Sequence, residues 1–272
     1  MNNYNYGILN NINGKELMVG GIIGYNYGTI INSNNYGDMN IQDGKNINYL
    51  GGITGYNNEG HLIGDVNYGE ISNEATDTHI YVGGVCGTNV GKIEKCINSK
   101  TGNVYAKSIN SYVIVGGIVA YNSYSHNFGN VTSSYNMANV IGYGVGTDNV
   151  SKFGGIVGSN KGGIVSNTYT VGNVSGIGAN GEYGLGGIAG GMTESATINN
   201  SYYLNTIESL YGYTDGTAIT ITNSSSKTAS EMKSSAFVDL LNAGLDEPAW
   251  GMATEGINDG YPILSFEVQV NK

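Results

Sequence analysis

The sequence predicts an all-β fold, a right-handed parallel β-helix (solenoid) of about six coils with a small α+β C-terminal cap. One observation is a phrase of eight residues, Val19 to Asn26, which returns five more times. Its first glycines are spaced by 31, 32, 33, 38 and 32 residues. The other observation is that the apolar segments are short, rich in Val and Ile and bounded by Gly and Asn, as strands are. A period near 32 residues, with about three short strands, is typical of one solenoid coil.

The repeats assign residues 1–204 to the solenoid and 205–272 to the cap. Residues 2–13 match the second half of a repeat, so we expect the chain to be cut from a longer array. Because a coil with nothing stacked on it leaves unpaired strand groups, we also expect self-association through the N-terminal edge.

Alignment of the repeats places one apolar residue of each repeat in each of three inward columns. The first column holds Ile22, Ile53, Val85, Ile118, Ile156 and Ile188. The second holds Ile30, Leu62, Ile93, Val131, Val165 and Ile198, and the third holds Met39, Ile71, Val104, Val140 and Val174. Stacking of like side chains would give the parallel sheets their packing.

A column of asparagines directly follows one strand of each repeat. It consists of Asn26, Asn57, Asn89, Asn122 and Asn160. Asparagine tolerates turn conformations and can hydrogen-bond to its equivalent in the next coil, so we interpret the column as a structural ladder.

The repeat signal fades from about Asn205, and the remaining segment predicts the cap. Thr228 and Glu231 have the spacing of a capping box. Apolar residues near helical spacing follow up to Asn242, and Gly244 is placed to end the helix. The run from Asn258 to Phe266 predicts a tight turn that leads into a strand. We therefore expect one helix and terminal strands.

The repeats resemble the GLUG-repeat family. The likeness rests on the phrase at 154–160, the second half at 165–176, and a small residue at the centre of each second half. That last position is occupied by Ser33, Asp65, Cys96, Ser134, Thr168 and Ser201. The resemblance implies β-solenoid arrays in large secreted or wall-attached bacterial proteins, including some IgA-cleaving metallopeptidases whose arrays lie outside the catalytic domain. It therefore implies an extracellular, cell-surface location, with the signal and anchor outside this segment.

Composition excludes several classes of partner. The formal net charge is -10, and the 11 basic residues form no cluster, which argues against nucleic acid. No apolar run approaches the length of a membrane span, so we expect no membrane insertion. Two cysteines, Cys86 and Cys96, are too few for a disulfide framework or a metal cluster, and we interpret both as buried small residues.

Candidate chemistry is sparse. His61, His79 and His126 belong to no His-Glu-x-x-His motif. Asp38 and Glu70 share an outward column and could lie about 5 Å apart, as the carboxylates of a retaining glycosidase do, but other repeats carry Asn there. We therefore expect no catalytic residues, metal or cofactor, and a chain that is not an enzyme.

Outward tyrosines are the candidate ligand-binding residues. They form two columns, Tyr6, Tyr36 and Tyr68, and Tyr25, Tyr56 and Tyr121. Such rings could present apolar faces and hydroxyl tips to glycans or host proteins, or could only brace adjacent coils. The function expected is a non-catalytic stalk or adhesin segment of a larger bacterial surface protein. The alternatives are a fragment of a carbohydrate-active β-helix enzyme and an accessory array of a surface metallopeptidase.

Overall fold

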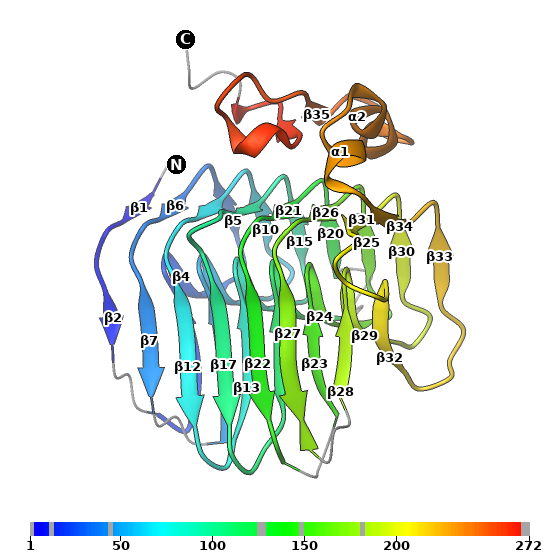
Figure 1. Cartoon of the computed structure of the whole chain (residues 1–272). Coiled ribbons are helices and arrows are strands. Elements are labelled where there is room, and N and C mark those ends of the chain that lie inside the picture. The colour runs from blue at the N-terminus through cyan, green and yellow to red at the C-terminus, as the bar shows by residue number, and fades with distance from the viewer. Residues whose placement is uncertain are drawn as a thin grey trace.

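The computed structural model describes residues 3–10, 14–42, 46–123, 129–146, 150–179 and 183–267; His126 lies outside them. The described chain is an all-β parallel solenoid of about six turns, which confirms the predicted fold class (Figure 1). Each complete turn contributes five described strands, one to each of five parallel sheets, instead of the expected three. The repeat is divided more finely because Gly and Asn bend the chain between strands of only two to six residues.

We number the five sheets in chain order. Sheet 1 contains β1 (Tyr4–Asn5), β6 (Asn34–Asn35), β11 (Val66–Asn67), β16 (Ile97–Asn98), β21 (Tyr135–Asn136), β26 (Tyr169–Thr170), β31 (Tyr202–Leu204) and β34 (Ser225–Lys227). Sheet 2 contains β2 (Leu9–Asn10), β7 (Met39–Gln42), β12 (Ile71–Ala75), β17 (Val104–Ser108), β22 (Val140–Gly144) and β27 (Val174–Gly178). Sheet 3 contains β3 (Glu16–Gly20), β8 (Asn46–Gly51), β13 (Thr78–Gly83), β18 (Val113–Gly116), β23 (Ser151–Gly154) and β28 (Tyr183–Gly186).

The other two sheets complete each turn. Sheet 4 contains β4 (Ile23–Asn26), β9 (Thr54–Asn57), β14 (Cys86–Asn89), β19 (Val119–Ser123), β24 (Val157–Lys161), β29 (Ala189–Thr193) and β32 (Tyr211–Thr214). Sheet 5 contains β5 (Thr29–Ile31), β10 (His61–Ile63), β15 (Lys92–Glu94), β20 (Asn130–Thr132), β25 (Ile164–Ser166), β30 (Thr197–Asn199) and β33 (Thr220–Thr222). Because β32, β33 and β34 pair in parallel with the preceding turn, the solenoid continues past residue 204 to Lys227.

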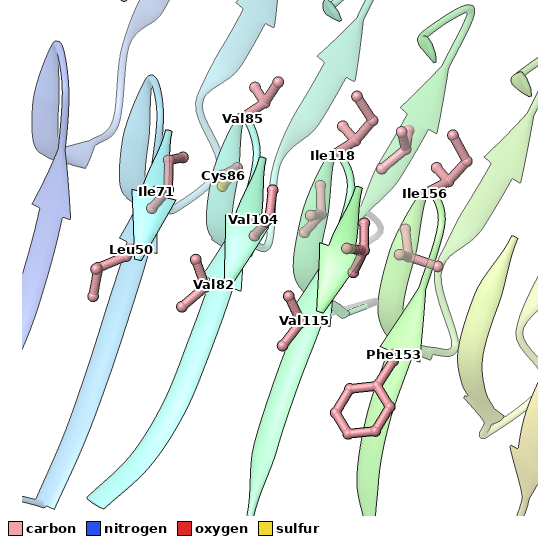
Figure 2. Close-up of a cluster of buried hydrophobic side chains, with 14 of the residues drawn as sticks. Leu50, Ile71, Val82, Val85, Cys86, Val104, Val115, Ile118, Phe153 and Ile156 are labelled. Carbon is pink, nitrogen blue, oxygen red and sulfur yellow. The ribbon is translucent and has the colours of Figure 1, made fainter. Parts of the chain in front are cut away.

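The interior of the solenoid is filled by the predicted columns of like residues. Figure 2 shows Val85, Ile118 and Ile156 repeating at the same place in successive turns. Members of all three columns are buried, apart from Ile22, which is half-buried because no turn covers it on the N-terminal side. A fourth column, from Leu50 to Phe153, adds to the same core.

The repeated phrase is in register throughout the stack. Its first glycines pair with one another from turn to turn in sheet 3. A Cβ on the second glycine has no room; at Gly84 it would collide with the carbonyl of Gly117 and the side chain of Asn98. Glycine therefore recurs here because the backbone of the next turn and a buried amide approach too closely for any side chain.

The C-terminal segment contains two short helices, not the single helix expected. Thr228 and Glu231 form the predicted capping box at the start of α1 (Ala229–Met232). The helix ends after Met232, because Ser234 caps the N-terminus of a second helix, α2 (Ser235–Asn242), by accepting from the Phe237 N–H. The strands β35 (Trp250–Gly251) and β36 (Ile263–Leu264) pair antiparallel, with the 3₁₀ turn η2 (Asn258–Gly260) between them. None of the described helices is long and apolar enough to cross a membrane.

This segment lies along a flank of the solenoid, above sheet 1, and runs back toward the N-terminal turns (Figure 1). Phe237 contacts Tyr169 and Tyr202 edge to face, and Trp250 packs against Tyr135 and Tyr169. Outward residues of sheet 1 thus form a second apolar core with the segment. The part predicted as a cap therefore covers a side of the stack, where the outward residues of sheet 1 are first aliphatic and then aromatic.

Candidate binding surface

The predicted asparagine column is a chain of hydrogen bonds inside the solenoid. Each Nδ2 donates to the Oδ1 of the next turn, at 2.8 to 2.9 Å from Asn26 to Asn160. The side chains are buried and also bond to the backbone of their own turns, as Asn89 does with the N–H and carbonyl of Gly91. These residues are in the wall of the fold, so they are not available to a ligand.

A second buried ladder, which the sequence analysis missed, runs along sheet 1. It links Asn5, Asn35, Asn67, Asn98, Asn136 and Thr170. The signal was present as Asn-Tyr-Gly at 5–7, 35–37 and 67–69. The tyrosine of this triplet was interpreted as a ligand-binding residue, whereas the asparagine before it is the residue that hydrogen-bonds one turn to the next.

Tyr6, Tyr36 and Tyr68, which we call the tyrosine row, follow the first three strands of sheet 1. The rings stack almost parallel, with centroids 4.8 and 4.6 Å apart and interplanar angles of 3° and 2°. Exposure falls from 73% at Tyr6 to 40% and 38% at the other two. Stacking covers the ring faces, so the middle of the row presents only ring edges and hydroxyls, and an open face remains only at its ends.

The second predicted column is part of a larger group on sheets 3 and 4, the tyrosine cluster, but is not continuous. Tyr25 and Tyr56 stack at 5.2 Å, whereas Thr88 lies between Tyr56 and Tyr121. Tyr81, from the neighbouring sheet, contacts Tyr121 edge to face at 5.9 Å. The complete tyrosine cluster comprises Tyr25, Tyr27, Tyr49, Tyr56, Tyr81, Tyr112 and Tyr121.

The phenols of Tyr25, Tyr49 and Tyr68 are neutral at physiological pH. Burial raises the pKa of Tyr68 and of Tyr49 to about 12. The hydrogen bond with Tyr27, together with burial, raises the pKa of Tyr25 to about 12. The hydroxyl groups therefore remain able both to donate and to accept hydrogen bonds.

Of the two acids that suggested a glycosidase pair, Asp38 accepts a hydrogen bond from the backbone of the other. Asp38 Oδ1 accepts from the N–H of Glu70 at 2.8 Å. In later turns, Asn103 Oδ1 accepts from the Asn139 N–H and Asn139 Oδ1 accepts from the Asn173 N–H, both at 3.2 Å. At these three positions the side chain accepts a backbone hydrogen bond from the next turn, which both Asp and Asn can do. Among the described residues, no three of His, Cys, Asp and Glu gather closely enough to hold a metal ion.

Asp65 and Cys96 occupy neighbouring turns of the buried small-residue column. Asp65 is fully buried, and its Oδ1 accepts from the Ser33 N–H at 2.7 Å. Its Oδ2 has no hydrogen-bond partner among the described residues. Burial raises the pKa of Asp65 to about 7. Burial, together with the nearby charge of Asp65, raises the pKa of the Cys96 thiol, and burial raises that of Cys86.

A pocket of about 350 Å³ lies at the inner end of the tyrosine row, between sheet 1 and the C-terminal segment. Tyr68 and Met137 belong to its walls, and the residue between them in the stack is Ser99. The Lys100 ammonium and the Asp259 carboxylate form an ion pair of 2.7 Å at its exposed rim. The sequence suggested Tyr68 but not the pocket, because the covering residues 256–267 are distant in the chain.

Comparisons with known proteins find little. No model of a known family matches the sequence, and no curated protein matches it. Among solved structures, the chain is similar to a putative immunoglobulin A1 protease from Bacteroides ovatus, with 19% sequence identity and a TM-score of 0.44. The match covers 86% of this chain and 78% of that chain.

Proposed function

We propose that this chain is a non-catalytic, GLUG-type module of a larger secreted bacterial surface protein, a stalk or adhesin segment that binds glycans or host proteins. The tyrosine cluster carries the proposal. Tyr27 is 67% exposed and Tyr25 38% exposed, and their rings meet at 55°, which leaves ring surface uncovered. Phenol hydroxyls beside open ring surface suit partners that combine apolar faces with hydroxyl or amide groups.

The solenoid supports the stalk part of the proposal. Hydrogen-bonded turns and two buried asparagine ladders hold the tyrosines on a wall with little local freedom, as a binding surface requires. Asp38, by contrast, is engaged with the backbone of the next turn, which favours a structural role for that acidic column over a catalytic one.

Replacing both Tyr25 and Tyr27 by serine tests the binding part. We expect the wild type to bind members of a panel of glycans and host glycoproteins on an array, and the double variant to bind at least about tenfold more weakly, since two aromatic contacts are lost. The matched control replaces Tyr143 and Tyr183, exposed tyrosines outside the cluster, by serine and should bind as the wild type does. Equal binding by all three proteins would contradict the cluster's role.

The N-terminal edge is proposed as a self-association surface. The strands β1 to β5 are terminal in their sheets, and Ile23 and Ile31 are 39% and 36% exposed there. Since edge strands offer unpaired N–H and C=O groups, we expect the mass measured by light scattering to rise with concentration. Lysine at Ile23 and at Ile31 should suppress that rise; a constant monomer mass for the wild type would contradict the proposal.

A further inference from the structure

We propose that the pocket beside Tyr68 binds one pyranose ring of a neutral glycan, stacked on the open face of Tyr68. The inference rests on the proposed binding function, to which it adds a site and a ligand class. It starts from the end of the tyrosine row. In register, Tyr68 is followed by Ser99 and then by Met137, so a small side chain lies between two large ones where the row ends.

The small side chain of Ser99 leaves a slot of suitable size. Two coil spacings separate Tyr68 from Met137, about 9–10 Å, which accommodates one ring between them. The floor comes from Val66, Ile97 and Tyr135 of sheet 1. The volume of about 350 Å³ falls within the ~300–1,000 Å³ usual for small-ligand sites, and suits a single sugar residue.

The column of Tyr25, Tyr56 and Tyr121, which Thr88 interrupts, has no comparable slot among the described residues. Thr88 breaks the stack between Tyr56 and Tyr121, yet its exposure is only 3%, since Tyr81 leans across from the neighbouring sheet. At Ser99 the C-terminal segment bridges the gap and roofs it with Ile257, Asn258 and Asp259. The space is therefore particular to this turn.

Polar groups at the rim match the edge of a sugar. Thr101 donates its hydroxyl proton to the Tyr68 carbonyl at 2.7 Å, so the 3.0 Å contact between Ser99 and Thr101 is donated by Ser99. The Ser99 oxygen can then accept from a ligand hydroxyl. The Lys100 and Asp259 pair offers a donor and an acceptor side by side, which fits two adjacent hydroxyls of a pyranose.

The charges favour a neutral ligand. Lys100 and Asp259 compensate each other, and Glu267 accepts from the Tyr135 hydroxyl at 2.8 Å and from the Leu264 N–H at 2.6 Å. Burial raises the pKa of Glu267. An anionic sugar would meet two carboxyl groups against one ammonium. An aromatic side chain would fill the slot but leave most of the rim groups without partners.

Filling the slot is the test. Ser99→Tyr would extend the row with a ring that the preceding turns already accommodate, whereas Ser99→Ala leaves the slot open. The probes are neutral methyl hexopyranosides and, as an aromatic probe, N-acetyltyrosinamide, measured by saturation-transfer NMR and by titration. We expect the wild type to bind a hexopyranoside with a dissociation constant on the order of millimolar, and Ser99→Tyr to weaken it at least about tenfold. Ser99→Ala, which removes one acceptor at the rim but leaves the slot open, should weaken binding only about fivefold, as the loss of one hydrogen bond does.

Tyr68→Leu provides a second variant in case Ser99→Tyr does not fold, as judged by circular dichroism, and should also weaken binding at least about tenfold. Binding of no hexopyranoside, unchanged binding in Ser99→Tyr, or a preference for N-acetyltyrosinamide would each overturn the inference. The proposed function is tested separately by the array with the Tyr25 and Tyr27 variant, in which this pocket is intact. If only the array result contradicts expectation, the tyrosine cluster is not the binding site but the pocket proposal is unaffected. If only the hexopyranoside result does, the pocket proposal is wrong and the role of the cluster is unaffected.

Discussion

Asn89→Ala is expected to destabilise the solenoid by ~4 kcal/mol, because it interrupts the asparagine ladder that runs from Asn26 to Asn160 in the middle of the stack. The Asn89 side chain accepts from Asn57 Nδ2 and donates to Asn122 Oδ1, both at 2.8 Å, besides its bonds to Gly91. Alanine leaves these partners buried, at ~1–3 kcal/mol for each group that finds no replacement. Urea unfolding followed by circular dichroism measures the effect.

The matched control is Asn173→Ala, at an exposed asparagine whose own N–H bonds to Asn139 and is untouched by the change. We expect the control to alter the free energy of unfolding by less than ~0.5 kcal/mol. If Asn89→Ala lowers the free energy of unfolding as little as the control does, water replaces the ladder bonds. The buried asparagines would then contribute little to the stability of the stack.

The ladders also show what the repeat pattern could predict. The asparagine column from Asn26 to Asn160 was recognisable because each Asn follows a Gly-rich strand at the same place in the repeated phrase. The ladder of sheet 1 has an equally regular signal, but its buried position depends on the direction in which two-residue strands such as β11 face. Periodicity over two residues cannot fix that direction, since either face satisfies it.

Long-range packing accounts for the rest of what the sequence did not indicate. The replacement of tyrosine by Ser99 is visible when repeats are aligned, but the pocket exists only because the segment around Asp259 folds back over sheet 1. The aromatic residues Tyr135 and Tyr169 fall at positions where earlier turns have Val66 and Ile97. The C-terminal segment packs on sheet 1 where this change occurs. The reason for the change is clear only from the structure, in which Trp250 packs against both tyrosine rings.

Asp65→Ser is expected to stabilise the protein by ~4 kcal/mol at about pH 8, and to lose this advantage as the pH falls toward about 4. The pKa of Asp65 is raised from 3.8 to about 7 in the folded protein. Folding therefore gains from this group only while it is protonated; the gain is complete below the unfolded pKa and is lost as the pH rises through the folded one. Urea unfolding of both proteins across this pH range measures the difference.

Serine suits the position because the column already uses it. The Ser134 hydroxyl accepts from the Cys96 N–H at 3.0 Å and donates to the Thr132 carbonyl at 2.8 Å, and a hydroxyl at position 65 can accept from the Ser33 N–H in the same way. Asp246→Ser, the same change at an exposed site, should show no such pH-dependent gain. If wild type and Asp65→Ser keep a constant difference from about pH 4 to 8, the carboxylate is solvated in the folded state. A difference that grows as the pH rises would mean that the one acid in a column of hydroxyls and a thiol weakens its turn once it ionises.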